Sequence, residues 1–186
     1  TRPGADLIDE KEELKRLASL LPGISKRFPK LPLSIDTFRS EIAKATIDMG
    51  AHIINDVSGG NLDDQMFKTV GALKVPYVLM HMQGNPQTMQ NKPTYEHVVA
   101  EILEDFGKKT YELVSCGVND VIIDPGFGFG KTVEHNYKIL NQLTDFAMIE
   151  MPILVGFSRK SMINKVLGTK PETALNGTSV LNSMAL

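Results

Sequence analysis

Five short apolar runs in this chain each end in a polar or glycine-led segment, and a helix-like stretch precedes each run. Strand-like and helix-like segments that alternate in this way indicate a parallel α/β sheet with right-handed crossovers. The carboxyl ends of parallel strands lie at the same edge of a sheet. We therefore expect the polar ends of these runs to converge on one pocket. The apolar runs occupy residues 33–35, 53–54, 77–79, 121–123 and 153–155.

The pattern predicts five strands and the helices between them, and it favours a closed barrel. Functional ends on five successive strands are typical of a (β/α)₈ TIM barrel, whereas a doubly wound sheet uses a few strands beside its switch point. A complete barrel needs about 250 residues. We therefore expect an incomplete barrel that lacks the first and last strands, in a single domain over 1–186 that is a fragment of a longer chain. The expected strands are 31–36, 52–57, 76–82, 120–124 and 152–157; the expected helices include 9–21 (stopped by Pro22 and Gly23), 62–72, 96–116, 134–146, 161–167 and 175–186.

Composition narrows the class of protein. The 186 residues are 42% hydrophobic and 23% charged, which is enough apolar material for a sizeable core. The net charge of −2 gives no electrostatic footprint for nucleic acid or an anionic membrane. One cysteine excludes an internal disulfide, and no apolar run approaches the roughly 20 residues of a membrane span. We expect a cytoplasmic enzyme.

Acidic and amide side chains end three of the expected strands. Asp36 and Asp124 follow apolar runs, where a carboxylate must be paired or hydrogen-bonded. The alternative for either is an internal ion pair with a lysine on a helix. Asn55 offers one donor and one acceptor, which suits the edge of a heterocycle, or else it caps neighbouring backbone.

The glycine-rich stretch 124–132 resembles a phosphate loop but fails the count. A Walker-type loop would need glycine where Pro125 stands, and the dinucleotide pattern fails because its third glycine comes one residue early. The glycines instead allow the backbone to approach a flat ligand, against which Phe127 or Phe129 could lie. The alternative is a merely flexible loop.

A basic segment stands where a helix is expected to begin. Arg159 and Lys160 between two serines, at a helix start, make a candidate anion site, with a solvated basic turn as the alternative. Thr1 and Arg2 could serve a second anion site. His81 is interpreted as a packed side chain rather than a base. The other histidines share no zinc-like spacing with it, and the sequence assigns no residue as a metal ligand.

Taken together, these motifs resemble the dihydropteroate synthase family, the pterin-binding folate-pathway enzymes inhibited by sulfonamides. The matching segments keep the family's order and span nearly the whole chain. They are Thr1-Arg2-Pro3-Gly4, Ser34-Ile35-Asp36-Thr37, the residues 54–60, the residues 80–86, the residues 124–131, and Gly156-Phe157-Ser158-Arg159-Lys160-Ser161. The family fold is a (β/α)₈ barrel, which agrees with the expectation from the strand pattern.

The resemblance implies a transferase that joins 6-hydroxymethyl-7,8-dihydropterin diphosphate to p-aminobenzoate and releases diphosphate, with Mg²⁺ as cofactor. It implies an SN1-like substitution in which Asp36 and Asp124 stabilise the pterin cation, with Lys160 as a third catalytic residue. It further implies a homodimer with small-molecule substrates only. By position, the pterin site comprises Asp36, Asn55, Met80, Asp124, Gly156 and Lys160; the diphosphate site comprises Thr1 and Arg2; and the p-aminobenzoate site comprises Arg2, Pro3, Phe129, Lys160 and Ser161.

Two other functions stay open at this point. A corrinoid-linked methyltransferase has a related pterin-binding barrel and would bind methyltetrahydrofolate. A non-catalytic module would bind a pterin or a partner protein without turnover. The Thr1-Arg2-Pro3-Gly4 and 158–161 segments favour the synthase, because they suit diphosphate and aminobenzoate, and the complete set of Asp36, Asn55, Asp124 and Lys160 argues against a decayed site.

Overall fold

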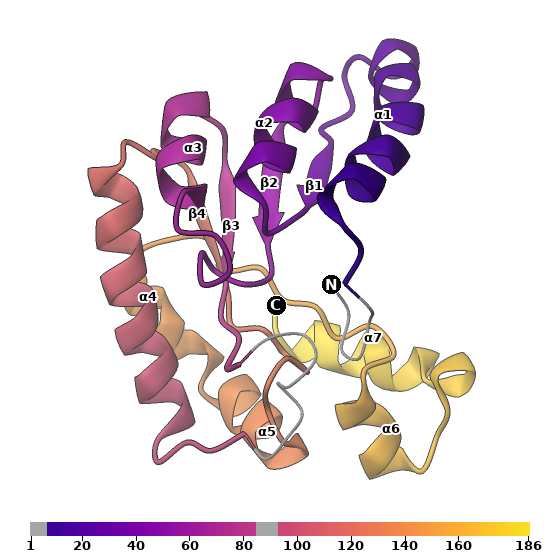
Figure 1. The fold of residues 1–186 in the computed structure, drawn as a ribbon. Helices are drawn as coiled ribbons and strands as arrows, with labels where there is room; N and C mark the ends of the chain where they lie inside the picture. The colour runs from indigo at the N-terminus through magenta and orange to yellow at the C-terminus, as the bar shows by residue number, and fades with distance from the viewer. Residues whose placement is uncertain (1–6, 85–92) are drawn as a thin grey trace.

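A four-stranded parallel sheet forms the centre of the fold. The computed structural model describes residues 7–84 and 93–186. The strands pair in chain order, and each is followed by a helix that returns the chain to the start of the next strand. The arrows in Figure 1 point toward the end of the molecule where α5, α6 and α7 lie. The strands are β1 (Ser34–Asp36), β2 (Ile53–Asp56), β3 (Tyr77–Met80) and β4 (Val121–Asp124).

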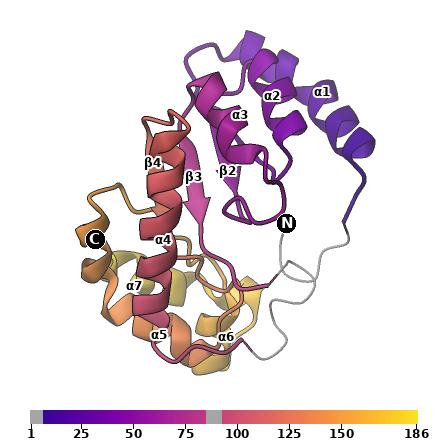
Figure 2. The ribbon, with the colours of Figure 1, turned by 60° about the vertical axis from the view of Figure 1, so that its left-hand side comes forward.

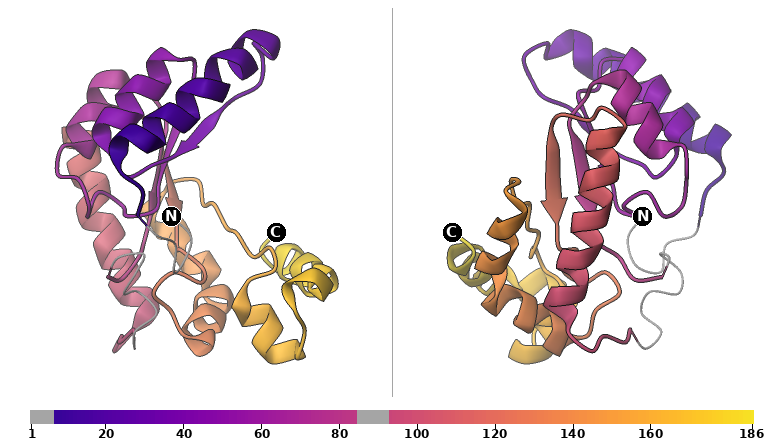
Figure 3. Two further views of the ribbon diagram at one scale, coloured as in Figure 1. Left: turned by 45° about the vertical axis from the view of Figure 1, so that its right-hand side comes forward. Right: turned by 90° about the vertical axis from the view of Figure 1, so that its left-hand side faces the viewer.

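Helices α1 to α4 cover one face of this sheet, as Figures 1 and 3 show. Successive helices contact one another from α1 through α7, apart from the short 3₁₀ segments between them. Figure 2 shows α4 running along β3 and β4 toward α5. The helices are α1 (Glu10–Arg27), α2 (Ser40–Asp48), α3 (Met66–Leu73), α4 (Val98–Ser115), α5 (Val133–Asn141), α6 (Ser161–Leu167) and α7 (Leu175–Met184), with 3₁₀ segments η1 (Leu143–Ile149) and η2 (Pro171–Thr173).

Helix α4 illustrates how the sequence produces this packing. Val99, Ile102, Phe106 and Leu113 recur at helical spacing and are all buried, while Tyr111 on the other side of the helix is exposed. Thr110 also lies on the buried face, where its hydroxyl donates to the Phe106 carbonyl at 2.6 Å and so is not left unpaired. The helix therefore buries one apolar face against the sheet and its neighbours.

The prediction that α1 stops at Leu21 is wrong. The helix continues through Pro22 and ends at Arg27. Pro22 lies on an exposed part of the helix, and Ser25 in the extra turns packs closely against Gly50, where a Cβ would lie 2.3 Å from the serine hydroxyl. Tertiary contact with the turn after α2 therefore outweighs the backbone hydrogen bond that the proline removes.

The predicted fifth strand, 152–157, is reduced to a single bridge. Ile153 bridges to Ile123 of β4, with the Leu154 N–H donating to the Ile123 carbonyl at 2.8 Å. The pairing is parallel, so this segment continues the order of the sheet. It goes no further along β4 because that strand ends at Asp124 and the chain turns at Gly126.

The prediction of one helix over 134–146 is also only partly right. The α-helix ends at Asn141, and the chain continues as the 3₁₀ segment η1. The helices predicted at 161–167 and 175–186 are confirmed, the second ending at Met184. Among residues 7–84 and 93–186, none of the helices is both long enough and apolar enough to cross a membrane.

Candidate active site

The strand register places four of the predicted pterin-site residues on the same face of the sheet. Asp36 pairs with Asn55, and Asn55 pairs with Val78. Met80 lies two residues beyond Val78, so it points to the same face, and it pairs with Asp124. All four residues stand at the carboxyl ends of their strands. This face is opposite the one that β2 and β3 bury against the helices.

Asp124 is the carboxylate with the most elaborate surroundings on this face. The Gly126 N–H donates to its Oδ1 at 2.8 Å. Burial raises the pKa of the Asp124 carboxyl, while the Gly126 hydrogen bond and the positive charges of Lys160 and Lys131 oppose that rise. Two lysines therefore flank this carboxylate, and together they favour its ionised form.

Lys160 brings a cation and an aromatic ring together beside Asp124. Its Nζ donates to the Phe127 carbonyl and lies 5.1 Å from the centroid of the Phe129 ring. Burial lowers the pKa of Lys160, and Asp124 opposes that change. Gly156 lies alongside, because a Cβ there would be 3.7 Å from the Lys160 ammonium. The structure therefore brings together Asp124, Gly156, Phe129 and Lys160.

Hydrogen bonds and a close backbone contact fix the conformation of the glycine-rich loop after β4. The Gly128 N–H donates to the buried Asn136 side chain at 2.7 Å, and the Phe129 N–H donates to the Gly126 carbonyl at 3.0 Å. Gly130 has φ +60°, and a Cβ there would lie 2.7 Å from the Gln83 carbonyl. The alternative of a merely flexible loop is therefore not supported. Phe127 of this loop is fully buried against Phe157, whereas Phe129 stays half-buried.

Lys131 is an internal residue, which no local pattern in the sequence indicated. Its side chain is only 4% exposed, and its Nζ contacts His81 Nδ1 at 3.1 Å. Burial lowers the pKa of Lys131 to about 7, with Asp124 opposing the change. Burial, then the charges of Lys131 and Lys109, lower the pKa of His81 to about 2. A neutral, buried His81 agrees with its interpretation as a packed side chain.

Asp56 is a second buried group that sequence reasoning missed. It stands next to Asn55 but points to the opposite face, because adjacent strand residues alternate. Its carboxylate accepts from the Ser58 N–H, the Ser58 hydroxyl, the Gly60 N–H and the Tyr77 hydroxyl, at 2.7–2.9 Å. Burial raises the pKa of Asp56 and these hydrogen bonds lower it. Asp56 therefore fixes the loop 57–60, which follows β2.

The basic segment before α6 lies partly as expected. Ser161 is the first residue of α6 and is exposed, as is Arg159. Arg159 has φ +54°, and its N–H donates to the Thr178 hydroxyl of α7 at 3.0 Å. This left-handed residue turns the chain so that Lys160 faces inward while Arg159 does not.

Three predicted residues cannot be placed, and the argument from burial fails for a fourth. Thr1, Arg2 and Pro3 lie outside the described residues. Asp36 is exposed on β1, so the argument from burial applies to Asp124 and not to Asp36. The roles of all these residues stay predictions.

No protein-only metal site is evident in the part of the chain that the structure describes. Within residues 7–84 and 93–186, no group of three or more histidine, cysteine or acidic side chains could hold an ion. Mg²⁺ is commonly held by one or two carboxylates together with substrate phosphate oxygens. The described side chains alone do not form a metal site, so Mg²⁺ stays a prediction.

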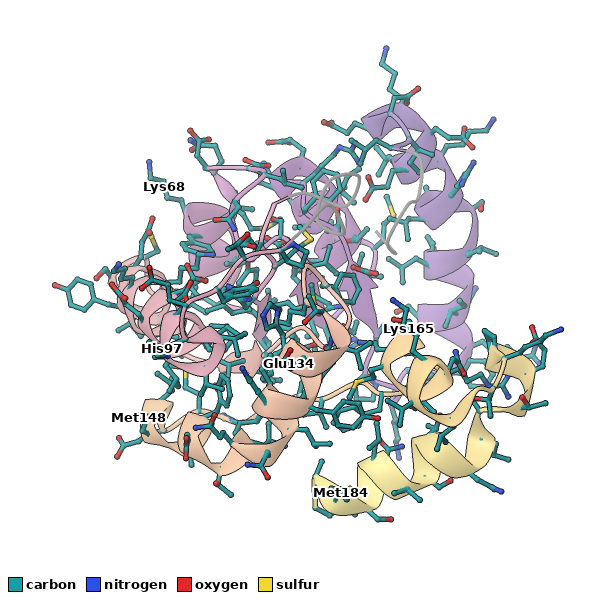
Figure 4. All side chains as sticks on the ribbon, turned by 90° about the horizontal axis from the view of Figure 1, so that it is seen from below. Lys68, His97, Glu134, Met148, Lys165 and Met184 are labelled. Atoms are coloured by element: carbon teal, nitrogen blue, oxygen red, sulfur yellow. The ribbon has the colours of Figure 1, made fainter. Side chains whose placement is uncertain are left out.

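Two cavities lie away from this cluster. One of about 440 Å³ lies beside His97 and Lys138, and another of the same size lies beside Ile153 and Met184. Figure 4 places His97 and Met184 on separate elements of the molecule. We assign the site to the carboxyl ends of the strands, because the Asp124 carboxylate, the Lys160 ammonium and the half-buried Phe129 ring meet there.

A parallel α/β fold whose polar side chains gather at the carboxyl ends of its strands is the arrangement of barrel enzymes that bind small molecules. Residues 1–186 match the family described as pterin binding enzyme. The chain belongs to the pterin-binding enzyme family.

Curated relatives support this membership. The chain is 39% identical over 180 residues to dihydropteroate synthase of Escherichia coli (strain K12), covering 96% of this chain and 63% of the relative. It is 39% identical over 169 residues to dihydropteroate synthase of Synechocystis sp., covering 90% of this chain and 58% of the relative. The chain therefore spans about three fifths of these relatives.

Solved structures agree with the fold. The crystal structure of Yersinia pestis dihydropteroate synthase with a sulfonamide drug complex has a TM-score of 0.93 at 35% identity, covering 99% of this chain and 67% of that one. The Thermus thermophilus dihydropteroate synthase in complex with 4-aminobenzoate has a TM-score of 0.93 at 33% identity, covering 100% and 71%. The resemblance seen in the motifs is confirmed, and so is the α/β fold as part of a TIM barrel.

Proposed function

We propose that this chain carries the active site of a dihydropteroate synthase. The observation that carries the proposal is the shared sheet face of Asp36, Asn55, Met80 and Asp124 at the carboxyl ends of four neighbouring strands, with Lys160 beside Asp124. The similar dihydropteroate synthases support it. The proposed substrates are 6-hydroxymethyl-7,8-dihydropterin diphosphate and p-aminobenzoate.

The pterin half of the reaction suits the groups on this face. The amino-pyrimidine edge of a pterin carries adjacent N–H donors, and an ionised Asp124 can accept two of them. Lys160 can donate to the carbonyl oxygen or a ring nitrogen, and Asn55 to the heterocycle edge. Met80, which is buried, supplies apolar contact to the ring. These groups hold the ring without a covalent bond to the protein.

The chemical step follows from where charge develops. When the C–O bond to diphosphate breaks, the dihydropterin ring takes positive charge, which the carboxylates of Asp124 and Asp36 stabilise. The amine of p-aminobenzoate is a free nucleophile at neutral pH, so its lone pair forms the bond to the resulting carbon, and the nitrogen then loses a proton to solvent. No strong general base is required. The half-buried Phe129 ring and the Lys160 ammonium offer a face for the aromatic acid.

Further parts of the proposal rest on the resemblance alone. Thr1 and Arg2 would bind the diphosphate, and Arg2, Pro3 and Ser161 would contribute to the p-aminobenzoate site. We also propose Mg²⁺ as cofactor for the departing diphosphate, a homodimeric assembly and a cytoplasmic location. The net charge of −2 supports a protein that binds small molecules rather than nucleic acid.

Diphosphate release tests this function in the natural full-length protein. We expect release only when the pterin diphosphate and p-aminobenzoate are both present, with dihydropteroate formed in equal amount. An Asp124→Asn variant should lose turnover, whereas Asp145→Asn, in η1, should retain it. Binding of methyltetrahydrofolate without diphosphate release would favour the methyltransferase, and binding of the pterin without turnover would favour the non-catalytic module.

A further inference from the structure

Lys131 is an internal lysine to which the proposed reaction gives no role. Its Nζ makes three contacts, to His81 Nδ1 at 3.1 Å, to the His81 carbonyl at 3.1 Å and to the Phe129 carbonyl at 3.0 Å. The side chain is 4% exposed. All the donors of this ammonium are therefore directed at protein groups, and none is directed at solvent.

These acceptors belong to two different strand ends. His81 follows β3 directly, and Phe129 lies in the glycine-rich loop after β4. The two segments also touch through backbone, because the His81 N–H donates to the Asp124 carbonyl at 2.9 Å and a Cβ on Gly126 would lie 2.1 Å from the His81 carbonyl. The Lys131 ammonium therefore joins the loop to the neighbouring strand.

The loop carries the aromatic ring of the site. Phe129 is half-buried, and its ring centroid lies 5.1 Å from the Lys160 ammonium. Lys131 holds the carbonyl of this same residue, and the Tyr95 hydroxyl holds the next carbonyl, that of Gly130, at 2.9 Å. Lys131 and Tyr95 therefore hold two successive peptide groups, 129–130 and 130–131, directly after the residue that carries the ring.

We propose that Lys131 is a positioning residue for the aromatic substrate: it holds Phe129 in the place where the ring meets p-aminobenzoate beside Lys160. This inference rests on the proposed function. A buried cation is costly unless its hydrogen bonds are satisfied. Here the Lys131 hydrogen bonds go to His81 at the end of β3 and to Phe129 in the loop after β4. The bonds that offset the cost of burying Lys131 therefore also hold the loop that carries the Phe129 ring.

Lys131→Met tests the proposal, because methionine keeps an unbranched side chain but provides no donor. We expect the KM for p-aminobenzoate at saturating pterin diphosphate to rise about tenfold, since a small displacement of a contact surface is enough for that loss. The Kd for the pterin diphosphate should rise by much less than this KM, because Asp124 loses the charge of Lys131 but keeps its Gly126 hydrogen bond and the charge of Lys160. Lys68→Met, on an exposed position of α3 (Figure 4), is the matched control and should change neither constant.

If folded Lys131→Met keeps the wild-type KM for p-aminobenzoate and shows only a lower melting temperature, then Lys131 serves stability alone and the proposal is refuted. A parallel loss of pterin affinity would also overturn the proposal, because it would mean general collapse of the site. If the variant does not fold, Tyr95→Phe tests the premise of the proposal, that anchoring this loop positions Phe129, by releasing the Gly130 carbonyl. Its KM for p-aminobenzoate should rise about threefold, and an unchanged value refutes the positioning argument. Failure of the proposed function itself would appear in the unmodified protein as no turnover.

Discussion

The hydrogen bond between Tyr77 and Asp56 allows the sharpest test of how this fold is held together. Both side chains are fully buried, and the Tyr77 hydroxyl donates to Asp56 Oδ2 at 2.7 Å. Burial and the Asp56 charge both raise the pKa of Tyr77 well above its usual value, so the phenol stays protonated and remains a donor. Tyr77→Phe removes this donor and little else, because a phenylalanine ring can keep the edge-on contact with Phe67.

The expected loss of stability follows from the charge on the acceptor. A hydrogen bond to an ionised group contributes about 1.5–3 kcal/mol, so Tyr77→Phe should lower the free energy of unfolding by about 2 kcal/mol. For a domain of this size that corresponds to a melting temperature about 4–8 °C lower. Urea unfolding followed by circular dichroism measures the change, and the slope against urea should stay the same.

The matched control is Tyr111→Phe, because Tyr111 is 79% exposed on α4. It should change the free energy of unfolding by less than about 0.5 kcal/mol. A loss below that limit in Tyr77→Phe as well would refute the reasoning, because it would mean that Asp56 does not depend on this donor.

Three further outcomes follow from the structure. Gly126→Ala should destabilise by more than about 1 kcal/mol in chemical denaturation, because Gly126 has φ +69° and an added Cβ would lie 2.1 Å from the His81 carbonyl. Phe106→Ala should cost about 3–5 kcal/mol in the same assay, because Phe106 is fully buried in the core. The pKa of Lys131 falls from 10.5 to about 7 in the folded protein, so the unfolded state binds more protons between those values. Unfolding free energy should therefore rise with pH in that window, by up to about 1.4 kcal/mol per pH unit, and Lys131→Met should remove this rise.

The strand ends could be predicted from the sequence because burial and alternation determine them. Asp36, Asn55 and Asp124 each end a short apolar run, and the parallel register brings them to one edge of the sheet. The helix at 161–167 was also predictable, since Gly168, in a left-handed conformation, ends it.

Features that depend on tertiary contact were not predictable in the same way. The continuation of α1 past Pro22 depends on packing against Gly50, which no local pattern reveals. The burial of Lys131 depends on acceptors from His81, fifty residues earlier in the chain. Asp56 is different, because strict alternation after Asn55 already implied that its carboxylate points toward the helices.

Pterin binding tests the central claim most directly. The claim is that carboxylate, amide and ammonium groups at the sheet edge form one site for a pterin ring. Calorimetric titration of the full-length protein with 6-hydroxymethyl-7,8-dihydropterin diphosphate should give one site per chain. Asp124→Asn should weaken binding by at least about tenfold, in line with the loss of one charge-assisted hydrogen bond. Equal affinity in the wild type and in Asp124→Asn would contradict the account.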